Sequence, residues 1–309
     1  MLTHPINSTQ RVEYIDLAKG FCIILVVLLH ITIFYHQRLP MPDFWRAFRM
    51  PLYFFLSGFF FKTYGGLGSF IKKKTNKLLI PFAFFYLTLS VFLSLFLHNF
   101  WGIELEKAQT FEVIPALTEF YGREHFPISA IWFLLCLFEV NILFYLCHLF
   151  AGLFKNRLPW LIACSLLIGF TGQMLCRFHI NLPMFIDSSM SSLPFFMMGY
   201  IINKHSQILH SSKYDNYIPI IIISSAVFIF FFAGRVSYRT NTFAGISYLT
   251  CYPCGLLGAL SIILIAKLIG HLPLISYWGR YSIMILVTHQ LLYQAYAAIM
   301  EIIGIRMGG

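Results

Sequence analysis

Long apolar runs with few charges constrain the fold of this chain more than any other feature. Nine such runs occur, at residues 15–36, 46–61, 78–100, 129–152, 158–176, 188–202, 217–234, 243–268 and 281–303. A helix needs about 20 mostly apolar residues to cross a hydrocarbon core about 30 Å thick, whereas barrel strands alternate in short segments. We therefore expect an all-α, polytopic transmembrane helical bundle with nine spans, or ten if the run 243–268 breaks at Pro253 or if two spans are merged.

The composition agrees with a lipid environment. Of 309 residues, 59% are hydrophobic and 11% are charged, whereas soluble domains carry about 25% charged residues. No repeat, low-complexity tract or linker divides the sequence, so residues 1–309 are expected to form a single domain. The formal net charge of +10 does not indicate nucleic-acid binding, because the basic residues lie in short loops between apolar runs and not in a separate basic domain.

The lysines predict an orientation in the membrane. The densest basic cluster is the segment 62–77, which contains Lys62, Lys72, Lys73, Lys74 and Lys77. Cytoplasmic loops are enriched in lysine and arginine, so we expect this segment in the cytoplasm. Two crossings precede it, which places the N-terminus in the cytoplasm too. The acidic loop 101–128 then lies outside.

The first apolar run contains ionisable residues, which are costly inside a membrane. Asp16 and Lys19 are three residues apart, so they are neighbours on one helix face and can pair. His30 follows Lys19 by eleven residues, which places it within about 20° of the same direction and about 16 Å further along the axis. Such groups usually face a protein interior or an aqueous pathway. His30 is either a buried histidine bonded to another helix or a general base that titrates near neutrality.

The segment Ile15–Gly20, with the apolar run that leads to His30, resembles the first helix of the acyltransferase-3 family of membrane O-acyltransferases. That helix typically has a basic residue, ten intervening residues and a histidine, and Lys19 and His30 match this spacing. Many members have arginine there, and lysine resembles the polysaccharide and fucose O-acetylase branch. Other segments that resemble family elements are Phe48–Phe59, Trp132–Leu134, Pro194–Tyr200 and Tyr281–His289.

The resemblance implies transfer of an acyl group, expected to be acetyl, from cytosolic acyl-coenzyme A to a hydroxyl group. The implied acceptor is a cell-surface polysaccharide, lipopolysaccharide or exported glycolipid, and the implied location is the bacterial plasma (inner) membrane. His30 would act as the general base, and Lys19 with Asp16 would set the local electric field. Acetyl-CoA would bind only as a co-substrate, with no permanently bound cofactor. The oligomeric state is left open.

Arg49 and Glu139 are further candidates for the catalytic site. Arg49 has a fixed charge and five donors, so it could hold an acceptor, orient the acyl carbonyl or stabilise an oxyanion, or it could be a snorkelling interfacial arginine. Glu139 lies in the middle of the fourth run, where a carboxylate must pair, protonate or face water. It could pair with Lys19 or Arg49, or orient His30.

Two further groups of residues are expected to bind substrates. The phosphates of coenzyme A would bind at Lys62, Lys72, Lys73 and Lys74. The acceptor would contact Ser57, Trp132 and His289. Packing is the alternative at each of these three positions: Ser57 with Gly58 permits close helix approach, and His289 lies in a polar patch that could supply a second acid or base.

Two alternatives to an enzyme remain. Intramembrane Asp, Lys, Glu and His side chains could form the path of a proton-coupled transporter or flippase, although transporters often have internal repeats and this chain has none. The second alternative is a non-enzymatic partner in a complex that assembles glycans. We expect no metal, because Cys251 and Cys254 lack a second cysteine pair or nearby histidines.

Overall fold

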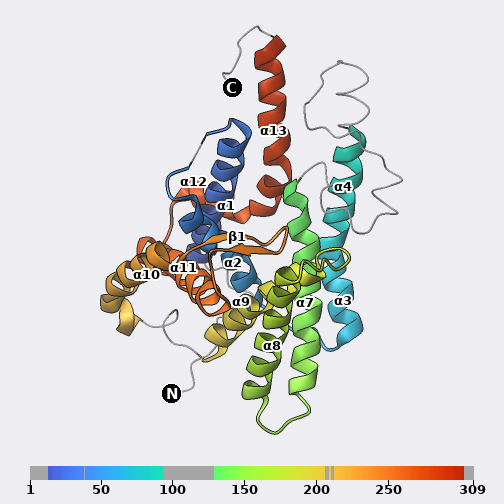
Figure 1. The fold of residues 1–309 in the computed structure, drawn as a ribbon, viewed down its shortest axis with the longest axis vertical. Helices are drawn as coiled ribbons and strands as arrows, with labels where there is room; N and C mark the ends of the chain where they lie inside the picture. The colour runs from blue at the N-terminus through green and yellow to red at the C-terminus, as the bar shows by residue number, and fades with distance from the viewer. Residues whose placement is uncertain (1–12, 38, 93–128, 206–208, 210–211, 303–309) are drawn as a thin grey trace.

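The computed structural model describes residues 13–37, 39–92, 129–205, 209 and 212–302, which form a helical bundle (Figure 1). A helix lies at each of the nine predicted runs. The helices are α1 (Glu13–Phe34), α2 (Pro42–Phe59), α3 (Leu67–Lys74), α4 (Ile80–Phe92), α7 (Trp132–Ala151), α8 (Arg157–Arg177), α9 (Ile186–His205), α10 (Ile218–Phe232), α11 (Tyr248–Ile269), α12 (Pro273–Arg280) and α13 (Ser282–Ile302). Shorter elements are the π-helical turn η1 (Thr75–Leu79), the 3₁₀ turns η3 (Ser129–Ile131) and η4 (Ser212–Tyr217), and strands β1 (Arg235–Ser237) and β2 (Thr242–Ala244).

The described helices identify an integral membrane protein. Five segments are long and apolar enough to cross a membrane: Glu13–Phe34, Trp132–Ala151, Arg157–Arg177, Asp215–Phe232 and Tyr248–Ile269. Large apolar side chains on α10 are exposed, as expected of a helix that faces hydrocarbon; Ile223 is 63% and Phe231 72% exposed. Helix α11 continues through Pro253, so the predicted break there is absent.

Helix α2 runs antiparallel to α1 and packs closely on α9. The Tyr53 hydroxyl donates to the carbonyl oxygen of Lys19 at 3.4 Å, and the Cys22 thiol donates to that of Arg49 at 2.9 Å. A Cβ atom added at Gly58 would collide with the carbonyl of Phe196 on α9. The close approach predicted for Ser57 and Gly58 therefore occurs, because a small residue lets two backbones meet.

Helix α12 lies against the first half of α1, and two glycines make this contact possible. A Cβ atom at Gly20 would collide with the carbonyl of Ile275, and one at Gly279 would collide with the carbonyl of Asp16. The chain then enters α13, which runs parallel to the second half of α1. Helix α12 was not predicted from the sequence, because an eight-residue helix is too short to produce an apolar run.

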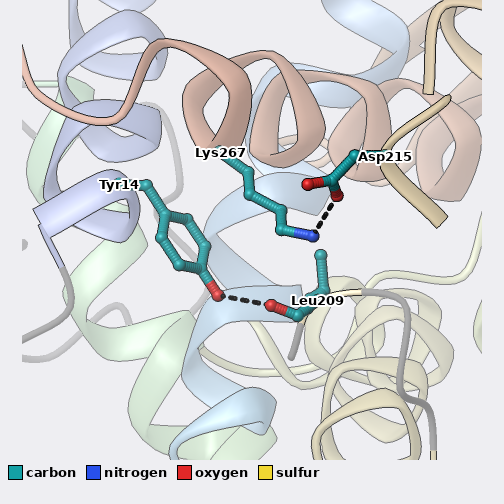
Figure 2. Close-up of polar contacts among 4 residues, drawn as sticks. All are labelled: Tyr14, Leu209, Asp215 and Lys267. Carbon is teal, nitrogen blue, oxygen red and sulfur yellow. Dashed lines mark hydrogen bonds and ion pairs between the residues drawn. The ribbon is translucent and has the colours of Figure 1, made fainter. Parts of the chain in front are cut away.

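The end of the bundle where α1 begins also carries the lysine-rich loop and α3, and we refer to it as the lysine end. The Lys19 ammonium lies 5.7 Å from the centre of the Phe60 ring, just before this loop. Two contacts fasten the segment after α9 to this end (Figure 2). Lys267 on α11 forms an ion pair with Asp215 at 2.6 Å, and the Tyr14 hydroxyl donates to the carbonyl of Leu209 at 3.4 Å.

The connection between α10 and α11 folds back into the bundle as a β-hairpin. Strands β1 and β2 pair antiparallel, with β1 beside α2 (Figure 1). Tyr238 at the turn is 3% exposed and contacts Phe54 and Phe195. The Asn241 side chain accepts from the Ser191 hydroxyl at 2.8 Å. The sequence analysis treated 235–242 as a loop and started the next span at 243, because strands of three residues are too short to show alternation.

Candidate functional site

Two histidines that are distant in sequence meet between α1 and α13. Nδ1 of His30 lies 3.0 Å from Nε2 of His289, and the ring centres are 4.9 Å apart. One turn further along both helices, the rings of Phe34 and Tyr293 are in contact, with 4.6 Å between their centres. His289 is only 4% exposed, whereas His30 is half-buried. Both histidines were candidate site residues from the sequence, but their contact could not be predicted from it.

The surroundings of His289 hold its ring in place. Nδ1 of His289 lies 3.0 Å from the carbonyl oxygen of Ile285, one turn earlier in α13. The next side chain, Gln290, accepts a hydrogen bond at 3.4 Å from the backbone N–H of Ala130 in η3. This bond brings the start of α7 beside α13. Trp132 lies at that end of α7, is 7% exposed and contacts the ring of Phe185, so the predicted acceptor-binding tryptophan is mostly buried.

Arg49 lies on α2 where this helix packs against α1, and its backbone carbonyl accepts from the Cys22 thiol. Side chains in an α-helix tilt toward the N-terminus of that helix. Because α1 and α2 are antiparallel, this tilt shortens the distance along the helix axes between the His30 and Arg49 side chains. The charge of Arg49 acts on His30. Within the described ranges, its buried Nε and Nη1 atoms have no hydrogen-bond partner. A buried guanidinium that lacks a counter-charge is costly, so this position suits an anionic group.

A second arginine comes from the hairpin and was missed in the sequence analysis. Arg239 follows the buried Tyr238, its Nε atom is buried, and its charge also acts on His30. One signal was present in the sequence, a basic residue within an aromatic-rich stretch between two spans. That signal was too weak to use, since only the folded hairpin brings Arg239 into the bundle.

Asp16 and Lys19 form the predicted ion pair, with 3.7 Å between Oδ1 and Nζ. At 1.5 Å per residue, His30 lies roughly 16 Å further along α1. The pair therefore belongs to the lysine end, and its predicted influence on His30 would have to act over that distance.

Glu139 and Ser57 contact neighbouring helices. The Glu139 carboxylate accepts from the Ser189 hydroxyl at 2.7 Å and from the backbone N–H of Phe185 at 3.3 Å. These contacts hold α7 to the start of α9, whereas the sequence analysis considered Lys19, Arg49 or His30 as partners. The Ser57 hydroxyl accepts from the Asn141 amide at 3.3 Å. These three hydrogen bonds join neighbouring helices, and the roles of Glu139 and Ser57 in the site remain predictions.

The lysines of the predicted donor site line the loop before α3 and the end of that helix. Lys62, Lys72 and Lys73 are exposed, and the Lys73 ammonium lies 4.4 Å from the centre of the Tyr64 ring. Lys74 is 9% exposed and lies over Phe70. Burial lowers the pKa of Lys74 to about 8, and the nearby charge of Lys77 acts in the same direction. The exposed ammonium groups of Lys62, Lys72 and Lys73 are thus available to phosphates, and Lys74 lies beside them.

No group of three or more His, Cys, Asp or Glu side chains that could hold a metal lies together in the part of the chain that the structure describes. All seven cysteines lie in that part and are free thiols.

The comparisons with known proteins give one result. The acyltransferase-3 family model, an acyltransferase domain, matches residues 12–306. The match runs from the start of α1 to beyond the end of α13, so it includes His30, Arg49 and His289. Comparisons with curated proteins and with solved structures gave no match.

Proposed function

We propose, from the premise that this chain belongs to the acyltransferase-3 family, that it moves an acyl group from acyl-coenzyme A to a hydroxyl of a glycan or glycolipid. The family match makes the chain an acyltransferase that transfers groups other than aminoacyl groups. The proposed acyl group is acetyl, and the proposed acceptor is a cell-surface polysaccharide, lipopolysaccharide or exported glycolipid. Lys19, where many relatives have arginine, favours the polysaccharide and fucose O-acetylase branch. The proposed location is the bacterial inner membrane, with the N-terminus in the cytoplasm.

The observation that carries the mechanism is the bond of 3.0 Å between His30 and His289. General bases are typically oriented by a second group that bonds the other ring nitrogen. His30 is the more accessible of the two rings. We therefore assign His30 as the base and place the acceptor hydroxyl against it.

The proposed reaction needs no reactant besides the acyl-coenzyme A and the acceptor hydroxyl. His30 removes the proton of the acceptor hydroxyl while the oxygen attacks the thioester carbonyl carbon. The C–S bond then breaks, the protonated His30 returns its proton to the sulfur, and an ester and free coenzyme A result. Negative charge builds up on the carbonyl oxygen before the C–S bond breaks. The buried donors of Arg49 suit that charge, because preorganised donors stabilise an oxyanion strongly in a low-dielectric site.

The lysine end suits the donor. Lysine ammonium groups bind phosphate as point charges, and Lys62, Lys72 and Lys73 are exposed there. His30 lies roughly 16 Å beyond Lys19 along α1. Coenzyme A carries its phosphates and its thioester at opposite ends of a long arm, so sites this far apart can serve both ends of one donor.

The test is release of free coenzyme A from acetyl-CoA by the purified protein with a cell-envelope glycan extract. Wild type is compared with His30→Ala and with His271→Ala, an exposed histidine in the turn between α11 and α12. We expect release by wild type and His271→Ala and none by folded His30→Ala. Equal release by all three proteins refutes His30 as base. Absence of release by wild type in several extracts refutes acyl transfer and favours the transporter alternative.

A further inference from the structure

We propose that His289 is a positioning residue that holds His30 as the tautomer protonated at Nδ1, so that Nε2 of His30 is the atom that takes the acceptor proton. This inference rests on the proposed function. It deepens that function by assigning a role to the buried partner and by naming the reactive nitrogen.

The carbonyl of Ile285 fixes the protonation of His289. A carbonyl oxygen only accepts hydrogen bonds, so Nδ1 of His289, 3.0 Å away, must carry a proton. A neutral imidazole has one N–H group, which leaves Nε2 of His289 with a lone pair. Helix α13 therefore presents an acceptor to α1.

That acceptor fixes the tautomer of His30. Nδ1 of His30 lies 3.0 Å from the lone pair on His289, and two lone pairs facing each other at this distance would repel. Nδ1 of His30 therefore carries the proton and donates it. The lone pair of neutral His30 is then at Nε2, the position a base needs.

The same bond strengthens during the reaction. When Nε2 of His30 takes the acceptor proton, its Nδ1–H becomes a charged donor, and bonds from charged donors are about twice as strong as neutral ones. The other charged groups that act on His30 are Arg49 from α2 and Arg239 from the hairpin. Their positive charges disfavour a further positive charge on His30, so we take the neutral pair as the starting state of the proposal.

Three substitutions at position 289 separate positioning from packing. In His289→Gln the amide oxygen reaches the place of Nε2 and can accept from His30. In His289→Asn the shorter side chain ends near the position of Nδ1, so it does not reach His30. In His289→Leu the side chain fills the space but has no hydrogen-bond acceptor. We expect kcat of His289→Gln to stay within about tenfold of wild type, and the Asn and Leu variants to lose about 10²-fold or more, because a wrong tautomer removes the base. KM for acetyl-CoA should change little.

A second measurement does not depend on activity. With ¹⁵N-labelled histidine, the His30 signals are assigned by their loss in His30→Ala, and NMR reports which ring nitrogen carries the proton. We expect protonation at Nδ1 in wild type and a shift toward Nε2 in His289→Leu. Protonation at Nε2 in wild type refutes the proposal, and so does equal kcat in all three variants of folded protein. Wild type that releases no coenzyme A refutes the proposed function instead, and the NMR result still decides the positioning of His30.

Discussion

Gly279→Ala should separate the two histidines without touching either. The new Cβ would collide with the carbonyl oxygen of Asp16 and crowd the backbone nitrogen of Gly20. Backbone atoms cannot rotate away as a side chain can, so α12 must move off α1. Overpacking of this kind costs about 1–3 kcal/mol. Gly279 precedes the first residue of α13 by three positions, so the displacement passes to His289.

The activity should fall because the hydrogen bond between His30 and His289 tolerates little increase in length. At 3.0 Å it is near the usual length, and a shift of about 1 Å would break it. A misplacement of that size can cost about 10²-fold in rate. We therefore expect Gly279→Ala to lower both the unfolding temperature in detergent and kcat for coenzyme A release, the latter by about 10- to 100-fold.

Gly68→Ala is the matched control, because the same atom added at Gly68 in α3 meets nothing within 4 Å. Alanine in a helix should be neutral there or stabilise by about 0.5–1 kcal/mol. Unfolding is followed by intrinsic fluorescence and activity by thiol release, on protein that elutes as one species. Gly279→Ala protein with the unfolding temperature and kcat of Gly68→Ala would refute the reasoning that α12 sets the position of α13.

Three further predictions concern charged groups. Arg49→Met should lower kcat about 10²- to 10³-fold if its donors face the oxyanion, with partial recovery in Arg49→Lys; an effect no larger than that of Arg46→Met would contradict this role. Because the pKa of Lys74 is about 8, it loses its charge as pH rises through that value, so KM for acetyl-CoA should rise between pH 7 and 9 in wild type and stay level in Lys74→Arg; a level wild-type profile argues against phosphate binding there. The partly exposed ion pair of Lys267 with Asp215 should contribute about 1 kcal/mol or less to the free energy of unfolding. The measurement is the coupling energy of a double-mutant cycle with Lys267→Met and Asp215→Asn. Zero coupling would show that the pair does not stabilise the fold.

The apolar runs predicted the helices because a membrane span imposes its own length and composition on a local stretch of chain. The Asp16 and Lys19 pair was predicted for the same reason, since residues three apart on a helix are neighbours whatever surrounds them. Helix α12 and the β-hairpin were missed. Both are short, and their burial depends on the surfaces they pack against.

The sequence by itself determined that the chain is a helical membrane protein, that His30 and Lys19 share one face of the first helix, and that lysines cluster near one end of the second. Only the tertiary structure decided that His30 touches His289, 259 positions away, and that the hairpin carries Arg239 to a place where its charge acts on His30. The tertiary structure also decided that the Glu139 carboxylate accepts a hydrogen bond from Ser189. The physical reason is that helix geometry fixes spacing within one segment, whereas contacts between segments depend on where backbones can approach closely, as they do at Gly20 and Gly279.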